Sequence, residues 1–157
     1  MISSKTVSSE ASEAETSDEE ISLSGYHILL AEDNLLNLEI AEFILTDAGA
    51  VVTKACNGEE ALQLFMEASP YEYDIILMDI MMPVMDGYQT TRAIRSLDRP
   101  DAKTIPILAM TANAFAEDRQ KTYAAGMDEH LTKPLDTELL LKTIAKYTPE
   151  KKAPMTP

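Results

Sequence analysis

Short apolar runs recur along the chain, and each is followed by a stretch in which apolar residues return every three or four positions. The runs are typical of buried strands in a parallel sheet, and the stretches are typical of helices that cover such a sheet. The predicted strands are residues 26–31, 51–54, 75–78, 105–110 and 130–132. The predicted helices are residues 35–48, a helix opened by Asn57-Gly58, 87–97, 116–125 and a last helix from Asp136 to about Tyr147. This alternation predicts an open parallel α/β sheet covered on both faces, with right-handed crossovers.

The two ends of the chain lack this pattern. Residues 1–24 are rich in Ser, Glu and Ala and contain no aromatic side chain. They bury too little apolar surface to offset their ordering entropy, so we interpret them as an acidic disordered linker or tail. Residues 25–147 are expected to form one domain, and residues 148–157 a frayed C-terminal tail.

The amino-acid composition limits the classes of partner that this chain is expected to bind. The chain carries 27 acidic and 13 basic residues, a net charge of −14, which argues against a nucleic acid or an anionic membrane as a direct ligand. A single cysteine, Cys56, excludes an internal disulfide and fits a reducing compartment. We also find no apolar run long enough for a membrane span and no signal-peptide pattern, so a cytoplasmic domain is expected.

Charged and hydroxyl side chains follow four of the predicted strands. Glu32 and Asp33 come after the first strand, Asp79 after the third, Thr111 after the fourth and Lys133 after the fifth. Each has an ordinary explanation on its own, as a helix cap, a charge at a helix N-terminus or a solvated lysine. The carboxyl ends of parallel strands meet at one edge of the sheet, where ligands of α/β proteins bind. Their joint placement therefore indicates a site.

The residue types at this edge suit phosphoryl chemistry. Three crowded carboxylates repel one another unless a cation lies between them, and Mg²⁺ is a hard cation that accepts carboxylates and keeps room for a phosphoryl oxygen. The hydroxyl of Thr111 and the ammonium of Lys133 suit two further phosphoryl oxygens. Asp79 is then the nucleophile that forms an acyl phosphate.

The sequence resembles the response-regulator receiver domain of two-component signalling. The matching segments are Ala31-Glu32-Asp33-Asn34, Asp79 within MDIMMPVMDG, Met110-Thr111-Ala112 and Leu131-Thr132-Lys133-Pro134. The resemblance covers roughly residues 25–147 and implies a flavodoxin-like, doubly wound sheet of five strands in the order 2-1-3-4-5.

The resemblance also implies a role for each site residue. Asp79 becomes the phosphoacceptor, and Glu32, Asp33, Asp79 and the backbone carbonyl of Met81 surround Mg²⁺. Thr111 becomes the switch hydroxyl and Lys133 the phosphate-binding lysine, with a cis peptide bond before Pro134. His130 occupies the switch position where many receivers carry Tyr or Phe; we expect a half-buried ring on an edge strand there, not a metal ligand.

The segments MTANAFAEDRQ and AGMDEHLTKPL are most similar to receiver modules of hybrid sensor histidine kinases. This likeness implies a phosphorelay acceptor that exchanges phosphoryl groups with the dimerisation and phosphotransfer domain of a histidine kinase and with a histidine-phosphotransfer protein. The implied parent is a protein-histidine kinase, which could itself be anchored in a membrane. A stand-alone response regulator that signals by protein contact is the alternative.

Three other classes fit less well. An aspartyl-nucleophile phosphatase resembling haloacid dehalogenases needs an acid two residues after the nucleophile, where this chain has Met81. A flavodoxin-like flavin-binding protein needs a phosphate-cradling loop after the first strand, where Glu32 and Asp33 would repel phosphate. A degenerate receiver that only binds partners would not need the complete set of site residues.

The first predicted helix carries more apolar residues than one buried face needs. The arc expected to face the sheet is Asn37, Ile40, Ala41, Ile44, Leu45 and Ala48. Leu35, Leu38 and Phe43 fall outside that arc, so we predict that they are exposed. They would form the apolar centre of a docking surface for the phosphotransfer partner, with acidic residues around it.

Overall fold

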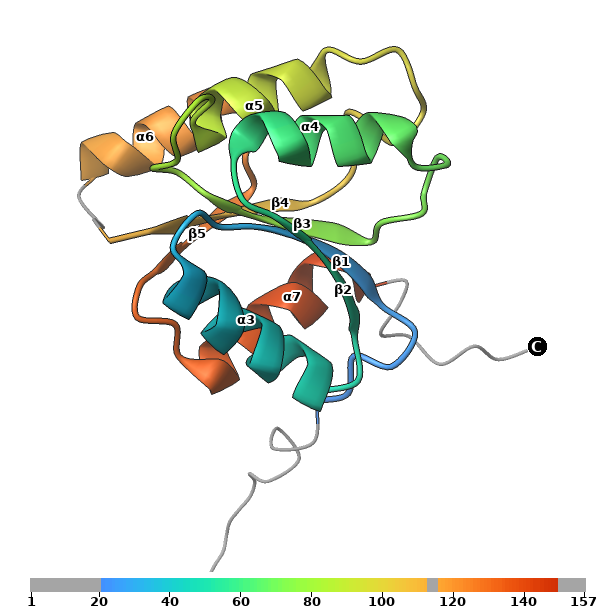
Figure 1. Cartoon of the computed structure of the whole chain (residues 1–157), viewed down its shortest axis with the longest axis vertical. Helices are drawn as coiled ribbons and strands as arrows, with labels where there is room; N and C mark the ends of the chain where they lie inside the picture. The colour runs from blue at the N-terminus through green and yellow to red at the C-terminus, as the bar shows by residue number, and fades with distance from the viewer. Residues whose placement is uncertain (1–20, 113–115, 150–157) are drawn as a thin grey trace, which may run out of the picture.

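The computed structural model describes residues 21–112 and 116–149, which form a parallel sheet between two layers of helices (Figure 1). The strands are β1 (His27–Ala31), β2 (Val51–Ala55), β3 (Ile75–Asp79), β4 (Ile107–Thr111) and β5 (Glu129–Thr132). All neighbouring pairs are parallel, and the strand order is β2-β1-β3-β4-β5. The predicted doubly wound fold and its order are therefore confirmed.

Within residues 21–112 and 116–149, five helices connect and cover the strands. They are α3 (Leu35–Asp47), α4 (Gly58–Glu67), α5 (Gly87–Arg95), α6 (Ala116–Ala125) and α7 (Thr137–Tyr147). Helices α3 and α7 lie on one face of the sheet, and α4, α5 and α6 lie on the other (Figure 1). None of the helices within the described ranges is long and apolar enough to cross a bilayer.

Local chemistry explains where several elements begin. Side chains of four N-cap residues accept hydrogen bonds from the first turns of their helices; these residues are Asn34, Asn57, Asp86 and Asp136. Strand β4 begins two residues later than predicted, after Pro106, which has no amide hydrogen to donate. The carbonyl of Pro106 still accepts a hydrogen bond of 2.9 Å from the amide of Ile76.

The alternation of side chains along the strands produces two cores. One core lies under α3 and α7, and its members include Ile28, Leu30, Leu45, Leu77, Leu108 and Ile144. The other lies under α4 and α5, with Leu29, Phe65, Ile76, Met78, Ile94 and Ile107. The whole of β3 and β4 is buried, as expected for central strands. The end of β3, and therefore Asp79, is held by packing on both sides.

Both predicted boundaries of the domain are too narrow. Leu23 is fully buried in the core under α3 and α7, and its amide donates a 2.7 Å hydrogen bond to the carbonyl of Ala48. Thr148 is 1% exposed, and its hydroxyl lies 2.8 Å from the hydroxyl of Tyr26. The folded unit thus includes residues assigned to the tails, while residues 1–20 and 150–157 of those predicted tails lie outside the described part of the chain.

Candidate functional site

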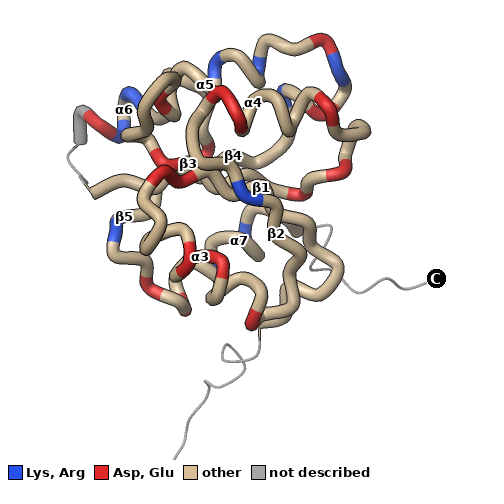
Figure 2. The backbone as a smooth tube through the Cα atoms, in the orientation of Figure 1, with Lys and Arg blue, Asp and Glu red and all other residues tan. Residues whose placement is uncertain are grey.

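The carboxyl ends of β1 and β3 bring three predicted acidic residues together. Glu32, Asp33 and Asp79 each offer a carboxylate oxygen, and these oxygens all lie within 4.8 Å of one another. Glu32 and Asp79 are 2% and 3% exposed, whereas Asp33 is exposed. Red acidic segments gather beside the β3 label at this edge of the sheet (Figure 2). The predicted acidic cluster therefore exists.

Lys133 joins this cluster from the end of β5. Its Nζ lies 2.8 Å from Oε1 of Glu32 and 3.2 Å from Oδ1 of Asp79. Its backbone amide donates a 2.7 Å hydrogen bond to the carbonyl of Thr111, the last residue of β4. The peptide bond between Lys133 and Pro134 is cis, as predicted. The ends of β1, β3 and β5 thus bring charged side chains into one cluster, and the role of the Thr111 hydroxyl at the end of β4 stays a prediction.

Burial and crowding change the acidity of Asp79. Removal from water, and next the charge of Glu32, raise the pKa of its carboxyl to about 7, although Lys133 acts to lower it. For Lys133, burial acts to lower the pKa, but the hydrogen bond to Glu32 and the charges of Asp79 and Glu32 outweigh it, so the pKa of the ammonium is raised. Lys133 therefore stays charged and neutralises only part of the cluster.

The remaining charge fits a divalent cation. When all four groups are ionised, three carboxylates face one ammonium, which leaves two negative charges without a partner among them. Carboxylate oxygens are ligands that Mg²⁺ accepts, and exposed Asp33 leaves one side of the cluster open to solvent. The residues present therefore suit Mg²⁺, which Glu32, Asp33 and Asp79 would hold.

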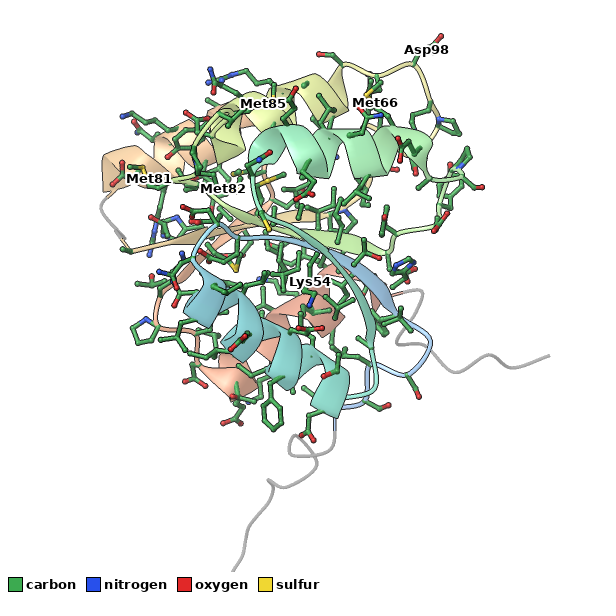
Figure 3. The ribbon with its side chains drawn as sticks, viewed as in Figure 1. Lys54, Met66, Met81, Met82, Met85 and Asp98 are labelled. Carbon is green, nitrogen blue, oxygen red and sulfur yellow. The ribbon has the colours of Figure 1, made fainter. Side chains whose placement is uncertain are left out.

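The loop from β3 to α5, residues 80–86, lies against this cluster and carries Met81. The amide of Ile80 donates to the carbonyl of Met110 at 3.1 Å, and the amide of Gly87 donates to the carbonyl of Ile80 at 2.9 Å. A Cβ atom on Gly87 would overlap the carbonyl oxygen of Asp79, so the return of the chain past the site requires glycine. Figure 3 labels Met81 and Met82 on this loop. The side chain of Met81 is exposed, and the metal contact of its carbonyl stays a prediction.

Comparison with known proteins identifies the family. A family model described as the response regulator receiver domain matches residues 28–145 of the chain. The chain belongs to this family.

Curated relatives of this receiver domain are large kinases. Hybrid signal transduction histidine kinase I of Dictyostelium discoideum is 37% identical over 135 residues, which cover 82% of this chain and 8% of that protein. Histidine kinase 5 of Arabidopsis thaliana is 34% identical over 172 residues, covering 94% of this chain and 18% of that protein. The receiver domain thus spans less than a fifth of the length of either relative.

Solved receiver domains share the fold. The receiver domain of sensor histidine kinase PA1611 of Pseudomonas aeruginosa PAO1, crystallised with magnesium in its active-site cleft, has 36% identity and a TM-score of 0.72, covering 80% of this chain and 99% of that one. A chain from the complex of Saccharomyces cerevisiae Ypd1, a histidine phosphotransfer protein, with the receiver domain of Ssk1 has 25% identity and a TM-score of 0.71, covering 82% and 92%.

The switch position of the receiver is more deeply buried than predicted. His130 lies on the edge strand β5, as expected, but it is only 9% exposed because α6 packs against this strand. Within the described part of the chain, neither ring nitrogen has a hydrogen-bond partner. Burial first, and then the positive charge of Arg119, lower the pKa of the imidazole. The predicted half-buried ring is therefore wrong, and His130 is a buried residue opposite Ala109 of the neighbouring strand β4.

The predicted docking residues separate into two groups. Leu35 and Phe43 are 67% and 69% exposed, whereas Leu38 is 4% exposed and packs in the core under α3. The assignment of Leu38 to the surface is therefore wrong. The apolar residues of α3 surround most of the helix, so their spacing did not determine which side faces the sheet. Ile40, which was predicted to face the sheet, is 47% exposed, so that assignment is also wrong. Leu36, which was assigned to neither side of the helix, is 65% exposed.

Proposed function

We propose that this receiver domain accepts a phosphoryl group on Asp79 in a Mg²⁺-dependent phosphorelay, as a module of a hybrid sensor histidine kinase. The observation that carries the proposal is the contact of Lys133 with both Glu32 and Asp79, because it brings a cation for the phosphoryl group beside a buried nucleophile. The receiver crystallised with magnesium in its cleft supports the choice of metal.

Each side chain of the site has its own role in phosphoryl transfer. A carboxylate oxygen of Asp79 attacks phosphorus while the bond from phosphorus to the donor nitrogen of a phosphohistidine breaks, and the electron pair returns to the imidazole. Lys133 pairs with one phosphoryl oxygen, and the hydroxyl of Thr111 donates to another. Glu32, Asp33, Asp79 and the carbonyl of Met81 would hold Mg²⁺, which when bound would supply positive charge for the approach of an anionic phosphoryl group to the carboxylates.

The kinase context rests on the relatives. The matched regions of the hybrid histidine kinases are small parts of those proteins, so a parent with sensor and kinase domains is the simplest arrangement for this chain. The partners are then the histidine-bearing domain of a kinase and a histidine-phosphotransfer protein, as in the complex of the Ssk1 receiver with Ypd1.

The docking surface for such a partner lies on α3. Leu35, Leu36, Ile40 and Phe43 are between 47% and 69% exposed and form one apolar strip along the helix. A strip of this kind on the helix next to the cluster supports a partner interface, since neighbouring apolar side chains exposed together mark binding sites more often than single ones do. Acidic Glu39 lies within the strip and is available for electrostatic selection of partners.

The proposal is tested by labelling and intact mass measurement. With a small phosphodonor and Mg²⁺, the unmodified protein gains one phosphoryl group, and Asp79→Asn gains none because an amide is a poor nucleophile. The matched control is Asp98→Asn, an exposed aspartate on the loop after α5 (Figure 3), which labels normally. Equal labelling of Asp79→Asn would disprove the phosphoacceptor, and equal labelling in excess chelator would disprove the role of the metal.

A further inference from the structure

Loop 80–86 is held in an unfavourable backbone conformation. Val84 has a φ of 72°, in the left-handed region, which is strongly unfavourable for a β-branched residue. The amide of Met85 donates a 2.7 Å hydrogen bond back to the carbonyl of Pro83 across this residue. Such a conformation persists only where the surroundings determine it. The loop must therefore be fixed by contacts at both of its ends.

The end nearer to Asp79 is fixed by the hydrogen bond from the amide of Ile80 to the carbonyl of Met110, and the hydrogen bond from the amide of Gly87 to the carbonyl of Ile80 ties the two ends of the loop together. The other end rests on Gly58, the first residue of α4. A Cβ atom on Gly58 would overlap both the carbonyl oxygen of Met85 and the hydroxyl of Thr90, and it would lie 2.9 Å from the carbonyl carbon of Met85. Thr90 is itself fully buried, and its hydroxyl donates to the carbonyl of Asp86 at 2.8 Å. The backbones of α4 and the loop therefore touch with no side chain between them.

Helix geometry does not explain the glycine. Gly58 lies in a regular first turn whose cap, Asn57, accepts a 2.8 Å hydrogen bond from the amide of Glu60. It does not have the left-handed φ that favours glycine, and helix propensity favours alanine over glycine. What requires glycine here is the close approach of Met85.

We propose that Gly58 is a positioning residue for the metal and phosphoryl site, acting through Met85 and loop 80–86. This inference rests on the proposed function, since it takes Met81 as a metal ligand and Asp79 as the phosphoacceptor. A side chain at position 58 pushes the carbonyl of Met85 away from α4. Because the near end of the loop is pinned to Met110, the displacement falls on residues 81–84 and moves the carbonyl of Met81.

The test compares Gly58→Ala with Gly126→Ala in the full chain. Gly126 has a φ of 106° and follows α6 at the opposite edge of the sheet, so alanine there strains the fold without contact with the loop. Calorimetric titration with Mg²⁺ is expected to show a dissociation constant raised about tenfold or more in Gly58→Ala, as for residues that support metal ligands. Gly126→Ala keeps the affinity of the unmodified protein despite its lower Tm. Compared with the unmodified protein, Gly58→Ala is expected to be labelled most slowly at low Mg²⁺ concentration. Its labelling rate recovers as the Mg²⁺ concentration approaches saturation of the site.

An unchanged Mg²⁺ affinity in Gly58→Ala, or an equal loss in Gly126→Ala, would overturn the inference. If Gly58→Ala does not fold, the inference is tested on the backbone amide NMR signals of the unmodified protein. Addition of Mg²⁺ with beryllofluoride is then expected to shift the amide signal of Gly58 and to leave the amide signal of Gly126 in place. A static Gly58 signal overturns the inference. Absence of labelling in the unmodified protein would instead reject the proposed function, so the two failures are distinguishable.

Discussion

Nζ of Lys133 lies 3.2 Å from Oδ1 of Asp79 and joins the end of β5 to the end of β3. The same ammonium is 2.8 Å from Oε1 of Glu32, so it pairs with two of the three carboxylates that would hold a metal ion. Lysine and metal therefore compete for the cluster before phosphorylation and act together after it, when the phosphoryl group brings further negative charge.

This competition predicts the behaviour of Lys133→Ala. The variant is expected to label at Asp79 about tenfold more slowly or worse, because the phosphoryl oxygens lose a charged partner. Its Mg²⁺ affinity stays equal or increases, since a competing cation is gone. Both quantities are measured with a small phosphodonor and by Mg²⁺ titration. Lys142→Ala, which removes a surface ion pair with Glu138, is the control. A large loss of Mg²⁺ affinity in Lys133→Ala would contradict the assigned role.

The raised pKa of Asp79 predicts a pH-dependent stability in chelator. Its carboxyl titrates near pH 7 in the folded protein instead of at its ordinary value of 3.8, so the folded state binds the proton more tightly than the unfolded state. The free energy of unfolding therefore falls as pH rises from about 4 to about 7. Asp79→Asn cannot titrate at this position, so its free energy of unfolding does not show this fall. Between about pH 4 and pH 7, the stability of the variant relative to the unmodified protein therefore increases by a few kcal/mol, at about 1.4 kcal/mol per unit of pKa shift.

Thermal unfolding of both proteins at several pH values measures this difference. The effect belongs to the metal-free protein, so chelator is required throughout. A stability difference that stays constant from acid to neutral pH would show that burial and Glu32 do not raise the pKa of Asp79.

Leu23→Ala tests the corrected boundary of the domain. Leu23 is fully buried, and removal of its side chain is expected to cost about 2–5 kcal/mol, the range for buried leucines. Leu36→Ala is the matched control, because Leu36 is 65% exposed and its loss changes stability by less than about 0.5 kcal/mol. Urea unfolding of both variants gives the comparison. Equal stabilities would mean that residues before Gly25 do not belong to the folded unit.

The sequence predicted the parts of this molecule that depend on local pattern. Central strands are continuous apolar runs with a polar residue at the end, so the strand ends, and with them Glu32, Asp79 and Thr111, followed from the sequence. The proximity of Lys133 followed because parallel strands share one carboxyl edge. These residues also carry the family resemblance, which supplied the strand order.

The features that were missed depend on tertiary contacts. The phase of α3 is ambiguous in sequence because Leu35, Leu36, Leu38 and Ile40 lie on several sides of the helix, and only packing against β1 and β2 selects Leu38. Leu23 is a single apolar residue in a polar stretch and has no periodic neighbours to mark it. The contact of Gly58 with Met85 joins segments on either side of β3, which no local pattern records.

The exposed strip on α3 leads to the last prediction. Phe43→Ser removes the largest side chain of the strip, which is 69% exposed, and so should leave the fold intact. If the strip docks a histidine-phosphotransfer protein, losing this contact costs about 1 kcal/mol or more of binding free energy and slows transfer about fivefold or more at limiting partner concentration. Labelling by a small phosphodonor needs no docking and stays unchanged.

Val51→Ser is the matched control for Phe43→Ser. Val51 is 62% exposed and opens β2, at the end of the sheet opposite Asp79, so its substitution removes exposed apolar surface outside the strip. Rates are measured by following phosphoryl transfer from a phosphorylated histidine-phosphotransfer protein to each receiver variant. Equal rates for Phe43→Ser and the unmodified protein would place the partner elsewhere on the surface. Slower labelling by the small phosphodonor as well would show instead that Phe43 supports the fold of α3, because a docking residue affects only the reaction that needs the partner.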